Sequence, residues 1–123
     1  MSVTKQPQKQ RKRVFSAATH RIKSLFSANL AKELRKKYGL RNFPLRKGDR
    51  VKIMRGQFKK RSGKIVDVQR KNRTVHIENI QVAKRDGTKA FYPFHPSNVQ
   101  VMELNLDDKR RKKKVEMKVK EKK

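Results

Sequence analysis

Hydrophobic and polar residues alternate in short runs from Gly48 to Leu104. Side chains two positions apart share one face of a strand, so each run predicts one short strand. The runs are Val51 and Ile53, Ile65 to Val68, Val75 and Ile77, Ile80 and Val82, Ala90 to Tyr92, and Val99 and Val101. A segment this short holds too few strands for a two-sheet sandwich, and it predicts a small, strongly bent antiparallel barrel.

Turn signals and changes of phase separate these runs. Asp86-Gly87 is a strong signal for a two-residue hairpin loop. Further turns are expected at residues 56–63, 71–73 and 93–98. The alternation changes phase near Asn79 and near Met102, which is the pattern of a β-bulge or a barrel corner.

The first 26 residues divide into an arm and a predicted helix. Residues 1–13 have no hydrophobic period and carry a basic cluster, so we expect an arm that is disordered without a partner. Ile22, Leu25 and Phe26 follow helical spacing, which predicts a short amphipathic helix within residues 17–26.

A second helix is expected between Asn29, a suitable N-cap, and Gly39, a common helix terminator. Its apolar face would carry Leu30, Leu34 and Tyr38, and its basic face Lys32, Arg35 and Lys36. One side of this helix could therefore dock on protein while the other side meets phosphate.

The charge of the chain is strongly unbalanced. Its 123 residues include 37 Lys and Arg but 10 Asp and Glu, a net charge of +27. The carboxylates are too few to neutralise so many cations within a compact fold, so the neutralising partner must be external. A nucleic-acid backbone fits, because each phosphate that a protein contacts releases condensed counterions.

The charge also divides the chain. The segment 1–47 carries 14 basic residues and one acidic residue, and it is predicted to be a basic N-terminal arm with short helices. Residues 48–104 are predicted to be the barrel, and residues 105–123 a basic C-terminal tail of low complexity. The predicted fold is thus mainly β, with short α-helices before the barrel and basic extensions at both ends.

Several other classes of protein are disfavoured. The sequence has no apolar run long enough for a membrane span, no membrane anchor and no hydrophobic secretion signal, so we expect an intracellular protein. It has no cysteine, and His20, His76 and His95 lie far apart, so no metal site, cofactor or catalytic centre is expected. Asp107-Asp108 is expected to cap a helix or to separate the barrel from the tail.

The stretch from Gly48 to Gly56, followed by Phe58-Lys59 and Gly63 to Val66, resembles the KOW motif. Gly48 and Asp49 would form the leading turn, and Val51 and Ile53 would point into the barrel. Gly56 and Gly63 would allow positive φ at the two ends of a loop. The exposed tip of that loop would present Lys59, Lys60 and Arg61 to an RNA backbone.

Further stretches extend the resemblance over nearly the whole chain. They are Arg11 to His20, Leu30 to Arg41, Pro44 to Asp49, and His95 to Val99. In this order and spacing they resemble the archaeal and eukaryotic form of the universal KOW-domain protein of the large ribosomal subunit. One departure is Lys60, because many members of that family have Gly directly after the loop lysine.

This resemblance implies a structural, non-enzymatic role. It implies an SH3-like barrel near the polypeptide exit tunnel, early binding to the 5′ region of large-subunit ribosomal RNA, and a role in subunit assembly. The implied partners are that RNA and neighbouring ribosomal proteins, in the cytoplasmic ribosome and, in a eukaryote, during nucleolar assembly. No homo-oligomer is expected. The alternatives are a KOW module of a transcription-elongation factor, and a basic nucleic-acid enzyme for which catalytic groups are lacking.

The candidate RNA-binding residues are mostly basic. They are Lys9, Arg11, Lys12, Arg13, Lys32, Arg35, Lys36, Arg46, Lys47, Arg55, Lys59, Lys60, Arg61, Lys64 and His95. His95 is expected to shape the barrel rim, with base stacking as the alternative role.

The aromatic residues have two possible roles. Alternation predicts that Ala90, Tyr92 and Phe94 are buried and that Phe91 is exposed, where it could stack on a base. For Phe15 and Phe43, contact with RNA or a neighbouring protein and packing on the barrel both remain open.

Overall fold

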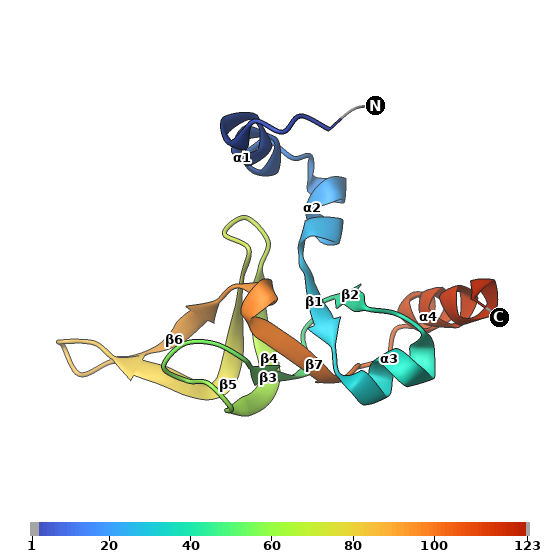
Figure 1. The fold of residues 1–123 in the computed structure, drawn as a ribbon. Coiled ribbons are helices and arrows are strands. Elements are labelled where there is room, and N and C mark those ends of the chain that lie inside the picture. The colour runs from blue at the N-terminus through green and yellow to red at the C-terminus, as the bar shows by residue number, and fades with distance from the viewer. Residues whose placement is uncertain (1–2, 123) are drawn as a thin grey trace.

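The alternating runs form strands in the computed structural model, which describes residues 3–122 (Figure 1). In chain order the elements are α1 (Pro7–Phe15), α2 (Thr19–Leu25), β1 (Ser27–Leu30), α3 (Lys32–Tyr38), β2 (Asn42–Pro44), β3 (Arg50–Ile53), β4 (Ser62–Gln69), β5 (Thr74–Ala83), β6 (Lys89–Phe94), the 3-10 helix η1 (Pro96–Asn98), β7 (Val99–Glu103) and α4 (Lys109–Glu121). The two runs predicted at residues 75–77 and 80–82 are one long strand, β5.

The strands form one seven-stranded sheet in the order β2-β1-β7-β3-β4-β5-β6. Strands β1 and β7 pair in parallel, whereas the other neighbours are antiparallel. Buried side chains from both ends of this order, including Leu30 and Phe94, belong to one hydrophobic cluster, so the sheet bends around a single core. The prediction of a small, mainly β fold with short helices is confirmed.

The predicted bulges and turns are present in the sheet. The register of β5 against β6 shifts between His76 and Gln81, where Asn79 has a φ of 62°. Met102 is bypassed where β7 pairs with β3, because Arg50 faces Glu103 and the next residue faces Val101. A hairpin joins β5 to β6 around Gly87, but its loop spans residues 84–88 and is longer than the predicted two residues.

Two glycines of the KOW-like stretch behave as predicted and one does not. Gly48 and Gly56 have φ values of 88° and 95°, which only glycine adopts readily. Gly63 does not have a positive φ. A Cβ at Gly63 would lie 2.8 Å from the Ile77 side chain and 2.9 Å from the Glu78 carbonyl oxygen. Glycine is needed there because β4 approaches β5 too closely for any side chain.

From Pro7 onward, the first helix contradicts the prediction that the arm at residues 1–13 is disordered without a partner, and residues 1–2 lie outside the described part of the chain. Helix α1 has Pro7 in its first turn, and Lys12 and Arg13 in its last turn, where cations face the negative end of the helix dipole. None of its residues is buried, which explains why no hydrophobic period marked it. The tip of the β4–β5 hairpin contacts its end, where Arg73 donates to the Val14 carbonyl oxygen and lies over the Phe15 ring.

The predicted helix between residues 17 and 26 is confirmed as α2, but the second helix begins later than expected. Asn29 is not its N-cap, because Asn29 lies in β1 and Ala31 precedes the first helical residue. The strand forms because its pairing with β7 buries Ala28 and Leu30 completely. Gly39 ends the helix with a φ of 62°, as predicted.

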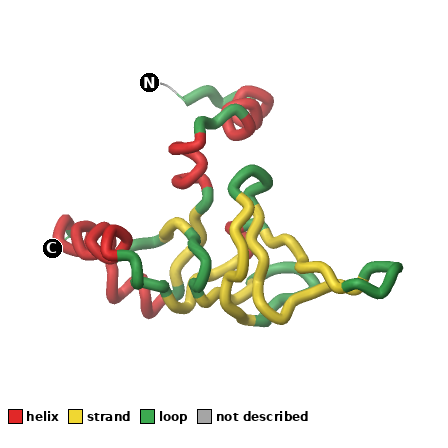
Figure 2. Tube along the Cα trace, turned by 180° about the vertical axis from the view of Figure 1, so that it is seen from behind, coloured by secondary structure: helices red, strands yellow, loops and turns green. Residues whose placement is uncertain are grey.

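The C-terminal tail packs against the rest of the fold. Asp108 caps α4 by accepting a hydrogen bond of 2.9 Å from the Arg110 backbone N–H. Helix capping was one of the two roles predicted for Asp107-Asp108. Helix α4 buries Val115 in the core and Arg111 beside it. Figure 2 shows α3 and α4 together beside the sheet, whereas α1 and α2 extend away from it.

Within residues 3–122, no helix is both long and apolar enough to cross a membrane.

A buried ion pair holds the tail in place. The guanidinium nitrogens of Arg111 donate to both carboxylate oxygens of Asp49, each over 2.6 Å. The side chain of Asp49 is fully buried and also accepts from the backbone N–H groups of Arg46 and Asn105, at 3.0 and 2.9 Å. Buried charges persist when their remaining hydrogen-bonding capacity is used in this way.

The same guanidinium binds two further segments of the chain. It donates to the carbonyl oxygens of Asn105 and Pro44, at 2.7 and 3.0 Å, and its carbon lies 5.3 Å from the centre of the Phe43 ring. Arg111 therefore links β2, the turn before β3 and the segment that follows β7. Phe43 is buried beneath it, so its role is packing.

We expect Arg111→Met to destabilise the protein by about 3–5 kcal/mol, because it leaves the Asp49 carboxylate buried without its cation. The matched control is Arg110→Met, which makes the same change at an exposed position of α4. Urea unfolding followed by circular dichroism measures both variants. Equal midpoints for the two variants would show that the ion pair does not stabilise the fold.

Candidate nucleic-acid interface

The loop from Met54 to Arg61, hereafter the basic loop, connects β3 to β4. Its base is closed by backbone hydrogen bonds of 2.8 Å between Ile53 and both Lys60 and Arg61. The side chains of Lys59, Lys60 and Arg61 are all exposed. The prediction that these three cations lie on an exposed loop tip is therefore confirmed. Their contact with RNA stays a prediction.

The backbone of the basic loop has a positive φ at two residues, Gly56 and Lys60, and only the first is a glycine. Lys60 has a φ of 73°, a conformation that costs a residue with a Cβ on the order of 1–2 kcal/mol. A lysine thus holds a backbone conformation that glycine adopts more readily, and it adds a charge at the tip of the loop.

Three aromatic rings pack beside the basic loop. Phe58 lies edge-on to Tyr92 and Phe94, with ring centres 5.1 and 5.9 Å apart, and Tyr92 lies 4.9 Å from Phe94. We call Phe58, Tyr92 and Phe94 the aromatic cluster. The Arg61 guanidinium lies 5.3 Å from the centre of the Phe58 ring, so the charged tip and the cluster are adjacent.

The prediction that Tyr92 is buried is wrong. Tyr92 is 38% exposed, whereas Phe94 is 5% exposed and Ala90 is half-buried on the same face of β6. The hydrophobic core ends near Phe94. Residues of this face that lie farther from the core, such as Tyr92, are therefore only partly covered. Phe91 is exposed as predicted, and its ring stacks on His76 with centres 5.8 Å apart.

A hollow of about 310 Å³ lies next to the aromatic cluster. It brings together Arg55 and His95, which the sequence placed in separate elements. His95 caps η1, because its Nδ1 accepts a hydrogen bond of 3.2 Å from the Ser97 backbone N–H. The ring thus shapes the rim of the fold, as predicted, and remains exposed.

The other candidate residues are dispersed over the surface. Lys9, Arg11, Lys12 and Arg13 are exposed on α1, Lys32 and Lys36 on α3, and Lys64 on β4. Arg35 is half-buried and donates from Nε to the Leu30 carbonyl oxygen over 2.8 Å, so it also holds α3 against β1.

Two candidate cations are paired with carboxylates. Arg46 binds Asp108, and its hydrogen bond is the main reason that the pKa of Asp108 lies below its usual value. The Lys47 ammonium lies 2.8 Å from Asp67 and lowers the pKa of that carboxyl group in the same way. Both carboxyl groups are therefore ionised at neutral pH, and these two cations are partly neutralised within the protein.

A second basic hollow, of about 200 Å³, lies between α2, β2 and α4. It is lined by Lys23, Arg46, Arg110 and Lys114, and by Arg111, which forms the buried ion pair with Asp49. Sequence reasoning missed Lys23, Arg110 and Lys114 as candidates. No local signal could have found them, because they come together only when Arg111 docks α4.

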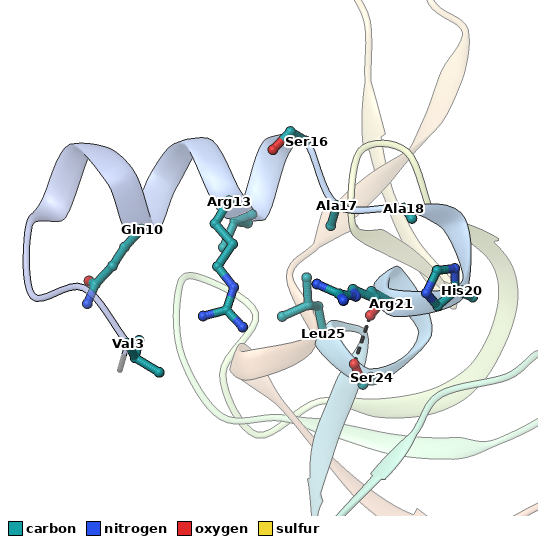
Figure 3. Close-up of a pocket in the computed structure, with 11 residues that line it drawn as sticks. Val3, Gln10, Arg13, Ser16, Ala17, Ala18, His20, Arg21, Ser24 and Leu25 are labelled. Atoms are coloured by element: carbon teal, nitrogen blue, oxygen red, sulfur yellow. Dashed lines mark hydrogen bonds between the residues drawn. The ribbon is translucent and has the colours of Figure 1, made fainter. Parts of the chain in front are cut away.

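A larger hollow, of about 670 Å³, lies between α1 and α2. Figure 3 shows Arg13 and Arg21 extending into the space between the two helices, with Leu25 beside them. Phe15, at the end of α1, is 82% exposed, and the Arg73 guanidinium lies over its ring. The described residues contain no group of three or more potential metal ligands.

Known proteins resemble this chain along almost its full length. A family model that describes the eukaryotic ribosomal proteins L26 and their archaeal counterparts matches residues 4–118. The large ribosomal subunit protein uL24 of Methanosphaera stadtmanae is 40% identical over 117 residues, which cover 95% of this chain and 100% of that protein. The protein of the same name from Korarchaeum cryptofilum is 42% identical over 112 residues, 91% of this chain and 86% of that protein.

The conformation of the basic loop predicts opposite effects for two neighbouring substitutions. Lys60→Gly should stabilise the fold by about 1 kcal/mol, because glycine removes the strain of a positive φ. Lys59→Gly, the matched control, should destabilise it by up to about 1 kcal/mol, because Lys59 has no positive φ and glycine adds unfolded-state entropy. Urea unfolding measures both, and shifts of the same sign would contradict the role given to Lys60.

Proposed function

Because the chain belongs to the family of eukaryotic L26 ribosomal proteins and their archaeal counterparts, we propose that it is a structural constituent of the large ribosomal subunit that binds ribosomal RNA. It is not an enzyme. The family match includes both flanks of the sheet, which favours the ribosomal function over a KOW module of a transcription-elongation factor. The chain would act in the cytoplasm as part of the ribosome, after nucleolar assembly if the source is eukaryotic.

The basic loop is the observation that carries the RNA-binding proposal. It presents three adjacent exposed cations on a turn whose backbone is fixed by hydrogen bonds to β3. Rigid presentation lowers the entropy lost when the side chains contact phosphates. Backbone contacts of this kind position a protein on RNA without reading its sequence.

The other basic surfaces support the same proposal. Helices α1 and α2 extend away from the sheet, so their exposed cations can follow an RNA groove at a distance from the basic loop (Figure 1). The hollow beside α4 gathers cations from α2, from α4 and from the segment after β2, and it can hold a phosphate group between them. Specificity would then come mainly from the shape of the RNA.

The finer parts of the proposal follow from the resemblance to the KOW-domain family. We place the RNA contact in the 5′ region of large-subunit ribosomal RNA, with the protein near the polypeptide exit tunnel and a role in subunit assembly. Neighbouring ribosomal proteins are the expected protein partners. The exposed apolar residues Phe15 and Met117 are available for such contacts.

Charge reversal in the basic loop tests the proposal. Changing Lys59, Lys60 and Arg61 to Glu should weaken binding to large-subunit ribosomal RNA and leave the fold intact, because all three side chains are exposed. Each lost phosphate contact should also remove roughly 0.7–0.9 from the slope of log affinity against log salt concentration. A salt titration by filter binding measures both quantities.

In the matched control, Lys84, Arg85 and Lys89 at the β5–β6 hairpin are changed to Glu. This gives the same change in net charge at another exposed site. We expect the control to lose less affinity than the loop variant. If the two variants lost affinity equally, the loop would contribute only to the overall charge. If the parent protein bound ribosomal RNA weakly and without salt dependence, RNA binding itself would be wrong.

A further inference from the structure

The hollow beside the aromatic cluster has the lining of a nucleobase site. We propose that it binds one unpaired base of the RNA, so that this face of the protein reads a base as well as the backbone. The proposal rests on the RNA binding proposed above and adds to it a defined ligand group and location.

The walls of the hollow offer a stacking surface. Phe58, Tyr92 and Phe94 all line it, and Tyr92 is 38% exposed there. The edge-to-face packing of Phe58 against Tyr92, at an interplanar angle of 62°, holds both rings in fixed orientations. An aromatic ring that is already immobilised loses little entropy when a base stacks on it.

The rim of the hollow carries positive charge. Arg55 lines it, and the Arg61 guanidinium lies 5.3 Å from the centre of the Phe58 ring. No acidic residue is among the described residues that line it. A nucleotide that inserts its base between these walls therefore keeps its phosphates beside cations and away from carboxylates.

Two side-chain amides in the lining can pair with the edges of a base. Gln57 and Asn98 both line the hollow, and each amide offers a hydrogen-bond acceptor and two donors. Within the described part of the chain neither side chain appears in any hydrogen bond. A flat ring with polar edges suits this combination better than an aliphatic protein side chain, which would leave both amides unpaired.

The test uses two five-residue oligonucleotides with identical phosphates. One has a central 2-aminopurine base between four stable abasic residues, and the other is abasic throughout. Because the charges are equal, any difference in affinity comes from the single base. The full-length protein should bind the first roughly 5-fold or more tightly than the second, since stacking one base on an aromatic side chain commonly contributes this much.

Two further readouts locate the base. The fluorescence of 2-aminopurine should be quenched on binding, and NMR signals of Phe58 and Tyr92 should shift with the first oligonucleotide but not with the second. Equal affinities, or shifts confined to other residues, would overturn the proposal. Equal affinities are also the result expected if the aromatic cluster docks a neighbouring protein instead.

Variants at neighbouring positions of β6 complete the test. Tyr92→Val should abolish the preference for the oligonucleotide with a base, and Tyr92→Phe should retain it. Phe91→Val is the matched control, because Phe91 is equally exposed but faces His76 on the other side of the strand. A preference that survives Tyr92→Val in the folded protein would contradict the proposed site. If that variant does not fold, the NMR shifts of the parent protein test whether the base binds beside Phe58 and Tyr92.

Binding of the parent protein to large-subunit ribosomal RNA is measured in parallel. If it binds this RNA but shows no preference for the base, the base site is wrong and the proposed function stands. If it does not bind the RNA, the proposed function fails whatever the oligonucleotides show.

Discussion

The fold depends on the buried ion pair between Asp49 and Arg111. Removing two charges from water is costly, and here the cost is offset by bidentate contact and by further hydrogen bonds from both side chains to backbone groups. An apolar pair could pack in the same space, but it would not fix the relative positions of β2, the Gly48 turn and the start of α4. The pair therefore determines where the two flanks lie relative to the sheet, and with them the hollow between α2, β2 and α4.

Three of the ten carboxylates of this chain have structural roles. Asp49 holds Arg111, Asp108 caps α4 and binds Arg46, and Asp67 pairs with Lys47. Most other cations, including those of the basic loop, are exposed and lack such a partner among the described residues. A few internal ion pairs thus stabilise the fold, and the exposed cations remain available to bind a polyanion.

The sequence predicted those parts of the structure that are governed by local pattern. The positions of β3 to β7, both bulges and the positive φ of Gly56 follow from side-chain alternation and from backbone sterics, which neighbouring residues determine. The packing of α4 was missed because it depends on Arg111, one cation within a run of similar cations. The strand at Ala28 and Leu30 was missed because its partner, β7, lies far away in the sequence. The Arg55–His95 hollow needed the same long-range information.

The order in which the chain is synthesised gives the β1–β7 pairing a further consequence. Parallel pairing joins Asn29 to Gln100, and the buried ion pair joins position 49 to position 111. Such distant contacts can form only after the residues up to Arg111 have left the ribosome that translates the chain, and they raise the contact order of the fold. The consecutive antiparallel strands β3 to β6 can pair earlier, whereas β1 and α4 can dock only once the later residues are available. Until then the basic flanks are not held against the sheet, and a nucleic acid that binds their cations during this interval competes with their docking.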